Sequence, residues 1–389
     1  MMISTCVEAP AKLQRGQKIY DAVHGFIRFN AIERKLIDSE PFQRLHHLHQ
    51  LGIAYIVYPG ATHTRFEHSL GTMELATRIF ERIAAKAAPL ENEEYWLQVI
   101  RLAALCHDLG HLPFSHDAEQ QLLGSGGHER WTLQAIQSAF LKPVWEMAAE
   151  HFPGQEIVSD VIKMAVGEKK LAEMGMPFVF SPMEKVLCQV ITGDFFGADR
   201  IDYLLRDAQC TGVSYGLFDY HQLIEMLCII PVGGEWELGI EENGIESCEA
   251  LLLARHFMHQ RVYQYSSVKT YKFHLSRFMV SFYAGGNYLG DLEGYLSLSD
   301  SEIIAALRRA AKDSQMPGHA DADAVVRRES RFRAIALKEG IGEGEILEAA
   351  ERAGVPAECL FREKKKEGKG SSLTLSFSVQ TRCGVVVPA

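Results

Sequence analysis

The sequence lacks several features that would set it apart from ordinary globular chains. It has no uncharged apolar run of about 18 residues, so no transmembrane helix and no membrane partner are expected. Its first residues contain no apolar segment ahead of a small-residue cleavage site, so we expect no secretory signal. The eight cysteines form no CxxC pair and are typical of reduced thiols. These absences together predict a cytoplasmic protein.

Positive charge is also scarce. The chain has 40 Lys and Arg residues against 50 Asp and Glu residues, a formal net charge of −10. This balance argues against nucleic acid as the main partner. The 47% of apolar and 23% of charged residues are typical of a folded globular protein. If such an acidic protein binds an anionic substrate, it must do so through a few specifically positioned cationic side chains or metal ions.

Strand signals are few, and helical spacing dominates the chain. Thr64 and Glu67 form a T-x-x-E capping pattern at the start of a segment that continues to Lys86 with helical apolar spacing. Residues 96–106 are apolar nearly all round, which predicts a buried central helix. Further helices are expected near 31–38, 42–50, 115–124, 128–140, 155–166, 183–191, 198–208, 219–227, 246–263, 270–285 and 300–312.

Two short segments favour β structure. Residues 228–232 and 236–240 flank Gly233-Gly234, which predicts a hairpin. The segment Leu373–Val379 alternates apolar and polar residues like a half-buried strand. The predicted fold class is therefore mainly α. The composition shifts after about residue 290, so we expect a helical core over 1–290 and a smaller mixed α/β appendage over 291–389. Residues 313–323 are loop-like.

Histidine is concentrated in one part of the chain. Nine of the 16 histidines lie between residues 46 and 128, whereas an even spread would place about a fifth of them there. A solvated histidine-rich face is the simplest interpretation of His46, His47 and His49. That interpretation does not suit His107, which follows the predicted buried helix directly.

His107 and Asp108 end that apolar helix just before Gly110. Neighbouring residues on a helix point about 100° apart, so both side chains can lean toward one atom at the helix end. A hydrogen-bonded core pair is the simple alternative, because a buried polar pair needs some partner. Its surroundings favour a functional site instead. His111 and His116 follow closely in the run C-H-D-L-G-H-L-P-F-S-H-D.

Two more residues of metal-binding type lie near the starts of predicted helices. His68 lies in the first turn of the helix predicted from Thr64, and Asp199 opens another predicted helix, G-A-D-R-I-D-Y-L-L-R-D. Two imidazoles and two carboxylates suit a borderline divalent ion such as Mn, Fe, Co, Ni or Zn. Such an ion lowers the pKa of coordinated water.

The run His68, His107-Asp108 and Asp199 resembles the metal motif of the HD-domain phosphohydrolases. Further segments over about 20–290 are similar, in order, to the deoxynucleoside triphosphate triphosphohydrolase branch of that family. They are V-H-G (23–25), I-D-S-E-P-F-Q-R-L (37–45), Q-L-G (50–52), P-G-A-T-H-T-R-F-E-H-S-L-G (59–71), H-D-L-G-H-L-P-F-S-H (107–116) and D-R-I-D-Y-L-L-R-D (199–207). No G-Y-P follows, which disfavours the cyclic-dinucleotide phosphodiesterase branch.

The resemblance implies an HD-domain catalytic core and a role for each matching residue. The residues that match metal ligands are His68, His107, Asp108 and Asp199. His111 and His128 match histidines that line the reacting phosphate, and His116 matches the proton carrier for the leaving oxygen.

The resemblance also implies a substrate-binding set. The residues that match triphosphate-binding groups are Arg65, Arg200, Tyr203 and Arg255. Those that match sugar-binding groups, or continue the motif R-x-x-x-H-x-x-x-Y, are Gln50, Asp207, His259 and Tyr263, with Tyr263 closing against C2′. Structural alternatives remain open: Arg65 as a surface residue, Tyr203 and Tyr263 as core aromatics, His259 as a core histidine, and His128 beside a helix cap.

The implied activity is hydrolysis of a dNTP to deoxynucleoside and triphosphate, with Mg²⁺ as a further ion on the substrate. The alternatives are an HD phosphohydrolase of another phosphoester, a di-iron oxygenase variant, and a non-catalytic module that binds nucleotide or single-stranded nucleic acid. The implied partners are the dNTP, a regulatory nucleotide and further copies of the chain in a dimer or tetramer. Asp38 and Gln43 of the regulatory surface are retained, but histidines replace its basic residues. This departure counts against a guanine activator.

Overall fold

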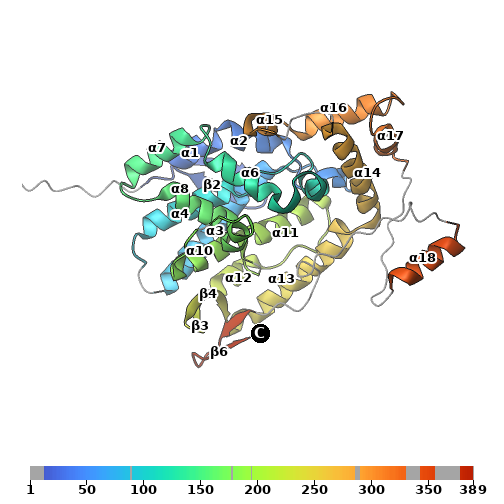
Figure 1. The fold of residues 1–389 in the computed structure, drawn as a ribbon. Helices are drawn as coiled ribbons and strands as arrows, with labels where there is room; N and C mark the ends of the chain where they lie inside the picture. Colours follow the sequence, from blue (N-terminus) through green and yellow to red (C-terminus); the bar gives the residue numbers. More distant parts are fainter. Residues whose placement is uncertain are drawn as a thin grey trace, which may run out of the picture.

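The structure is a computed structural model, and it describes residues 13–87, 90–176, 178–193, 195–284, 290–329, 342–354 and 377–388. Most of these residues are helical (Figure 1). The mainly α fold class predicted from the sequence is confirmed. Among the described residues, no helix is long and apolar enough to cross a membrane.

The chain begins with a hairpin and continues through a compact set of helices. The first elements are β1 (Gln17–Asp21), β2 (Gly25–Phe29), α1 (Ala31–Ile37), α2 (Glu40–Gln43), α3 (Arg65–Lys86), α4 (Glu93–Cys106), α5 (Glu119–Leu122), α6 (Gly127–Ile136), α7 (Lys142–His151), α8 (Ile157–Val166), α9 (Glu168–Glu173), α10 (Pro182–Thr192) and α11 (Ala198–Thr211). The antiparallel pair β1–β2 has Ile19 opposite Ile27, and Ile27 is buried.

The second half adds a small sheet and a further group of helices. Its elements are α12 (Tyr220–Met226), β3 (Leu227–Val232), β4 (Glu235–Glu241), α13 (Ile245–Met258), a π-helical turn (His259–Tyr263), α14 (Ser266–Tyr283), α15 (Leu292–Leu296), α16 (Asp300–Ala310), α17 (His319–Arg327), α18 (Glu343–Arg352), β5 (Ser378–Gln380) and β6 (Val386–Pro388). The sheet order is β3-β4-β5-β6, with β4 and β5 parallel.

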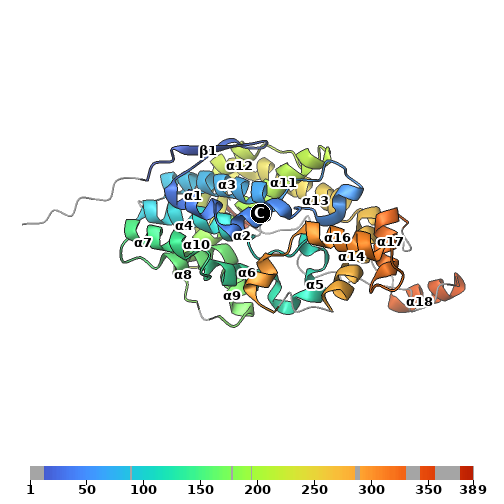
Figure 2. The ribbon, with the colours of Figure 1, turned by 90° about the horizontal axis from the view of Figure 1, so that it is seen from above.

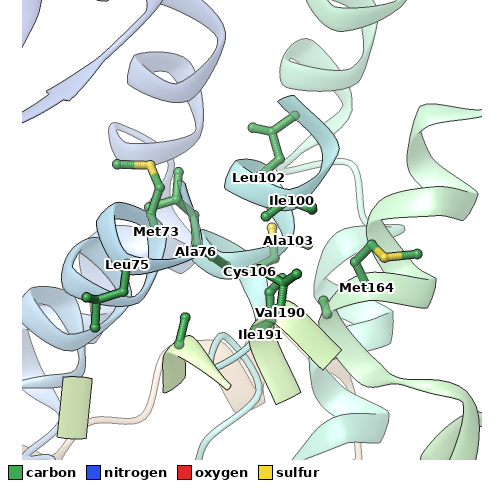
Figure 3. Packing of buried hydrophobic residues seen from close by; sticks show 14 of the residues in the cluster. Met73, Leu75, Ala76, Ile100, Leu102, Ala103, Cys106, Met164, Val190 and Ile191 are labelled. Carbon is green, nitrogen blue, oxygen red and sulfur yellow. The ribbon is translucent and has the colours of Figure 1, made fainter. Parts of the chain in front are cut away.

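The main hydrophobic core surrounds α4. Residues from Val99 to Cys106 are all buried, as the apolar character of this segment predicted. Figure 3 shows Ala103 and Cys106 of α4 between Met73 of α3 and Val190 of α10. Because α4 is buried over its last two turns, the polar side chains that follow it emerge at its C-terminal end. The core thus fixes where His107 emerges.

A second hydrophobic cluster joins the C-terminal helices to the core. It includes Phe278 of α14, Ile303 of α16 and Val325 of α17, together with Ile53 and Phe114 from the first third of the chain. The group of α14, α16 and α17 lies at one side of the helical body, away from the small sheet (Figure 1). The expected boundary at residue 290 stays a prediction.

Most predicted elements are present, and the errors have local causes. The hairpin turn at Gly233-Gly234 is confirmed, and both glycines have positive φ. The capping box is wrong, because Thr64 is the N-cap of α3 but accepts no capping hydrogen bond. Residues 319–323, expected to be loop, belong to α17. Within Leu373–Val379 the strand β5 begins at Ser378, and residues 373–376 lie outside the described ranges.

A buried ion pair fixes the elements that lead to the site. Arg101 of α4 is 1% exposed and donates to both carboxylate oxygens of Glu33, at 2.6 and 2.8 Å. It also donates to Thr77 Oγ1 on α3 and to the carbonyl of Arg28 on β2. Burial alone would raise the pKa of Glu33, but Arg101 outweighs it and keeps the carboxyl pKa lowered. One guanidinium therefore ties β2, α1, α3 and α4 together.

We predict that Arg101→Met lowers the free energy of unfolding by about 3–5 kcal/mol, because it leaves the Glu33 carboxylate buried and unpaired. Urea denaturation measures this change. The matched control is Lys142→Met, which removes an exposed partner of Glu146 and should change stability by about 1 kcal/mol or less. A loss as small as the control's in Arg101→Met would contradict this role for the ion pair.

Candidate metal centre and nucleotide site

Three helix ends bring the four proposed metal ligands together. His68 lies in the first turn of α3, His107 is the C-cap of α4, Asp108 follows it, and Asp199 lies in the first turn of α11. Ligand atoms of His68, His107 and Asp199 all lie within 4.8 Å of one another. Asp108 completes the group, with carboxylate oxygens 3.6 Å from His68 Nε2 and 3.4 Å from His107 Nε2.

The two histidines are turned so that Nε2 faces the centre. His107 Nδ1 donates to the carbonyl of Ala104 at 2.7 Å, and His68 Nδ1 donates to Asp202 Oδ2 at 2.8 Å. Both Nε2 atoms are buried and satisfy no hydrogen bond, and that of His68 lies 3.0 Å from Asp199 Oδ1. A bond at Nδ1 fixes the tautomer whose Nε2 lone pair is free for a metal. The group therefore fits a divalent ion held by nitrogen and oxygen ligands.

The surrounding carboxylates make this centre attractive to a cation. Burial lowers the pKa of His68, but Asp199 and Asp202 outweigh it and raise the pKa to about 10. Burial likewise raises the pKa of Asp199, yet His107 and His68 bring it well below its ordinary value. The Asp199 side chain is 37% exposed, whereas those of His68 and Asp108 are nearly inaccessible. The centre is thus open to solvent on the Asp199 side.

A buried network stands behind His68. Asp202 is fully buried and accepts from His68, from His24 Nε2 at 2.6 Å and from Arg206 at 2.9 Å. Arg206 donates in turn to Asp21 Oδ2 at 2.7 Å. Because a Cβ atom at Gly71 would lie 1.9 Å from Asp202 Oδ1, only glycine lets α11 approach α3 this closely. This network holds the imidazole of His68 in place.

The three proposed catalytic histidines form a second cluster beside the metal centre. The rings of His111 and His128 are stacked with centroids 3.7 Å apart, and His116 lies edge-on to both. His111 Nε2 is 3.2 Å from Asp108 Oδ1, which connects the two clusters. Burial, with Arg65 and His128 nearby, holds the pKa of His111 well below its ordinary value. His111 is therefore a neutral imidazole near pH 7.

Glu119 organises this cluster, and the sequence interpretation missed it. Its carboxylate accepts from His128 Nδ1 at 2.8 Å and contacts His116 Nδ1 closely. Burial lowers the pKa of His128, but Glu119 outweighs it and leaves the pKa raised. The H-x-x-E spacing from His116 to Glu119 was a visible signal, since residues three apart share a helical face.

Three of the nucleotide-binding candidates, Tyr203, Asp207 and Tyr263, lie on α11 and the π-helical turn. Tyr263 donates to Asp207 Oδ2 at 2.8 Å, and His63 Nε2 donates to Asp207 Oδ1 at 2.7 Å. The ring of Tyr203 is edge-on to that of Tyr263, 6.2 Å away. Asp207 is thus held between two donors, and His63 is a partner that the sequence interpretation missed.

Several buried polar atoms near this region have no partner within the protein. They are Gln50 Oε1 and the Nε and one terminal nitrogen of Arg200. Native proteins rarely leave buried polar atoms unpaired, so such atoms are typical of a ligand site. Arg65 differs, because its Nε donates to Ser115 Oγ at 2.9 Å and its guanidinium contacts Asp108 closely. Arg65 therefore already has anionic and hydroxyl partners.

The predicted spacing of Arg255, His259 and Tyr263 on one α-helix is wrong over its last turn. Arg255 lies on α13, which ends at Met258, and His259–Tyr263 form the π-helical turn. Such turns occur mostly as single inserts in helices, and they are frequent at functional sites. The wider turn shifts Tyr263 out of α-helical register, while its hydroxyl still reaches Asp207.

Comparison with known families and proteins agrees with this geometry. The HD domain profile matches residues 65–175, and the profile of the HD associated region matches residues 218–324. A crystal structure of a hypothetical protein from Aquifex aeolicus superposes with a TM-score of 0.76 at 31% identity, covering 95% of this chain and 90% of that one.

Curated relatives span different kingdoms. An uncharacterized protein of Methanocaldococcus jannaschii is 32% identical over 75% of this chain and 54% of its own length. The deoxynucleoside triphosphate triphosphohydrolase SAMHD1 of Homo sapiens is 30% identical over 64% of this chain and 41% of its own length. The chain thus spans about half the length of the curated relatives it matches.

The matched HD domain begins at Arg65, three residues before His68, and includes His107 and Asp108, while the associated region begins after α11. The geometry of the proposed metal ligands agrees with the matches to the HD domain and to its associated region. This chain belongs to the HD-domain phosphohydrolase family.

Proposed function

We propose that this chain hydrolyses deoxynucleoside triphosphates to deoxynucleoside and triphosphate in a metal-dependent reaction. The observation that carries the proposal is the metal centre, where the buried Nε2 atoms of His68 and His107 converge with the carboxylates of Asp108 and Asp199. The SAMHD1 relatives, which are named for this activity, support the choice of substrate. The proposed function makes the dNTP the partner of this chain. Its assembly with further copies of itself stays a prediction.

A divalent ion held by His68, His107, Asp108 and Asp199 would supply water of lowered pKa close to the substrate phosphorus. Mn, Fe, Co, Ni and Zn suit this nitrogen and oxygen ligand set, because no thiolate contributes. The partial exposure of Asp199 leaves room for the substrate on that side.

Because the protein has a net charge of −10, specific cationic side chains must offset the negative charge of the substrate. A triphosphate carries about four negative charges, and guanidinium groups bind phosphate oxygens through two parallel hydrogen bonds. Arg200, with buried unpaired nitrogens, is the strongest candidate. Arg255 on α13 is the second, while Arg65 acts chiefly by orienting Asp108.

The histidine cluster would handle the proton of the leaving group. The His116 side chain is 61% exposed, so it can reach a bound substrate, and Glu119 holds its Nδ1. Burial raises the pKa of Glu119, but His116 and His128 outweigh it, so the carboxylate stays ionised. When His116 carries a second proton, its Nδ1–H is held by the Glu119 carboxylate and its Nε2–H would donate to the departing 5′ oxygen.

The first prediction concerns the products. Chromatography should resolve deoxynucleoside and intact triphosphate when each dNTP is incubated with the metal-loaded protein. In ¹⁸O-labelled water the triphosphate should carry the label, because attack at the α-phosphorus breaks the bond to the 5′ oxygen. Labelled orthophosphate without triphosphate would instead indicate an HD phosphohydrolase of another specificity.

The second prediction concerns Asp202, which should orient His68. Asp202→Asn should weaken metal affinity roughly 10–100-fold, because outer partners of metal ligands have effects of that size. Competition with a chelator measures the affinity. The matched control is Asp219→Asn, an exposed N-cap of α12 that should retain wild-type affinity. If a folded Asp202→Asn protein kept the wild-type metal affinity, Asp202 would not be needed to orient His68.

The third prediction concerns sugar selection by Tyr263. A ring packed against C2′ should disfavour ribose by roughly 2–3 kcal/mol, or about a hundredfold. Tyr263→Ala should therefore raise the ratio of kcat/KM for NTP to that for dNTP, while overall activity falls. His259→Ala should leave the ratio unchanged. Equal losses for both sugars in Tyr263→Ala would make the ring a packing residue only.

A further inference from the structure

The loop that carries His111 and His116 is attached to a segment far along the chain. Asp300, at the start of α16, accepts from the backbone N–H of Phe114 at 2.7 Å. The same carboxylate accepts from the backbone N–H of His49 at 2.9 Å and contacts the His49 ring. His46 and His47 are exposed, but His49 is not part of the solvated face expected from the sequence.

The backbone of this loop adopts an uncommon conformation. Phe114 and Ser115 are consecutive non-glycine residues with φ of 58°, in the left-handed region. L-residues visit this region rarely, so surrounding contacts must hold it. The Phe114 ring is fully buried in the cluster formed with α14 and α16. Asp300 is 2% exposed, so its bond to the Phe114 N–H is shielded from water.

Two further contacts from the same segment reach the loop. Tyr295 donates from its hydroxyl to the carbonyl of Gly110 at 2.5 Å, and its ring stacks on Trp131 of α6 at 3.9 Å. Arg44 bridges the two segments, because it donates to the carbonyls of Leu298 and His111 at 2.8 and 2.9 Å. Seen from above, the orange segment ahead of α16 passes beside α6 (Figure 2).

The contacts lead from the loop into the metal centre. Ser115 Oγ donates to the carbonyl of His49 at 2.7 Å and accepts from Arg65 Nε. Arg65 in turn contacts Asp108, one of the proposed metal ligands. A change of the backbone at Phe114–Ser115 would therefore move Arg65 and displace His111 and His116 relative to the metal.

We propose that residues 292–300 form a clasp that holds the loop 109–117 in its catalytic conformation, with Asp300 as the positioning residue. This inference rests on the proposed function for its kinetic consequence, but its structural consequence is independent of any substrate. The C-terminal part of the chain would then be a component of the active centre and not a separate appendage.

The test compares Asp300→Ala, Asp300→Asn and Tyr295→Phe in the full-length, metal-loaded protein. Hydrogen exchange of peptides covering 109–117 should accelerate in Asp300→Ala, while peptides from α3 and α4 stay protected. The kcat for dNTP should fall about 10–100-fold, since a displacement of about 1 Å can cost a hundredfold. Metal content should stay at the wild-type value, because the hydrogen bonds of Asp300 and Tyr295 end on His49, Phe114 and Gly110 and not on any of the four proposed ligands.

The other variants grade the effect. Asp300→Asn keeps an oxygen acceptor for the Phe114 N–H but loses the charge, so it should restore part of the kcat and of the protection. Tyr295→Phe keeps the stacked ring and removes only the bond to Gly110, so its effect should be smaller. The matched control, Asp291→Ala, removes the exposed N-cap of α15 just before the clasp and should change neither measurement.

Wild-type protection of 109–117 in Asp300→Ala would overturn the clasp, and so would equal acceleration over α3 and α4, which indicates general loosening. Selective acceleration in a protein that never hydrolyses dNTP would support the clasp and reject the proposed function. The two ideas therefore fail separately.

Discussion

The site depends on one constraint, the close approach of α3, α4 and α11 around buried charge. These helices deliver two imidazoles and several carboxylates to a largely buried place that is open to solvent on the Asp199 side. Isolated charges are costly in such a place, so each must have a partner. Asp202 is paired with His24, His68 and Arg206. The Nε2 atoms of His68 and His107 are left, and a metal ion is the partner that fits them.

The same principle shows how an acidic protein could bind the triphosphate of the proposed substrate. Its cations are few at the site and are placed by the fold, with Arg65 committed to Asp108 and two buried nitrogens of Arg200 left without a partner. The Glu119 carboxylate holds the Nδ1 atoms of His116 and His128, which keeps both imidazoles near the proposed leaving group. With a metal ion and a phosphate bound as proposed, charges of both signs would alternate across the site, from the ligand carboxylates to the imidazoles and Glu119.

The sequence predicted those parts of the site that depend on local pattern. The apolar segment 96–106 implied a buried helix, and the structure places His107 at its end. By contrast, the contact of Asp300 with His49 spans 251 residues, and no periodicity reveals such a pair. The hairpin β1–β2 was also missed, because Tyr20 and Phe26 are exposed and blur its alternation. The π-helical turn has no spacing signal that distinguishes it from α-helix.

Anomalous diffraction from crystals of the metal-loaded protein, recorded at the absorption edge of the bound metal, tests the central claim most directly. The account predicts one peak about 2.0–2.2 Å from the ligand atoms of His68, His107, Asp108 and Asp199. A rival cluster exists in the same protein, formed by His111, His116 and His128. A peak at that cluster alone, or no peak in protein that carries stoichiometric metal, would contradict the account.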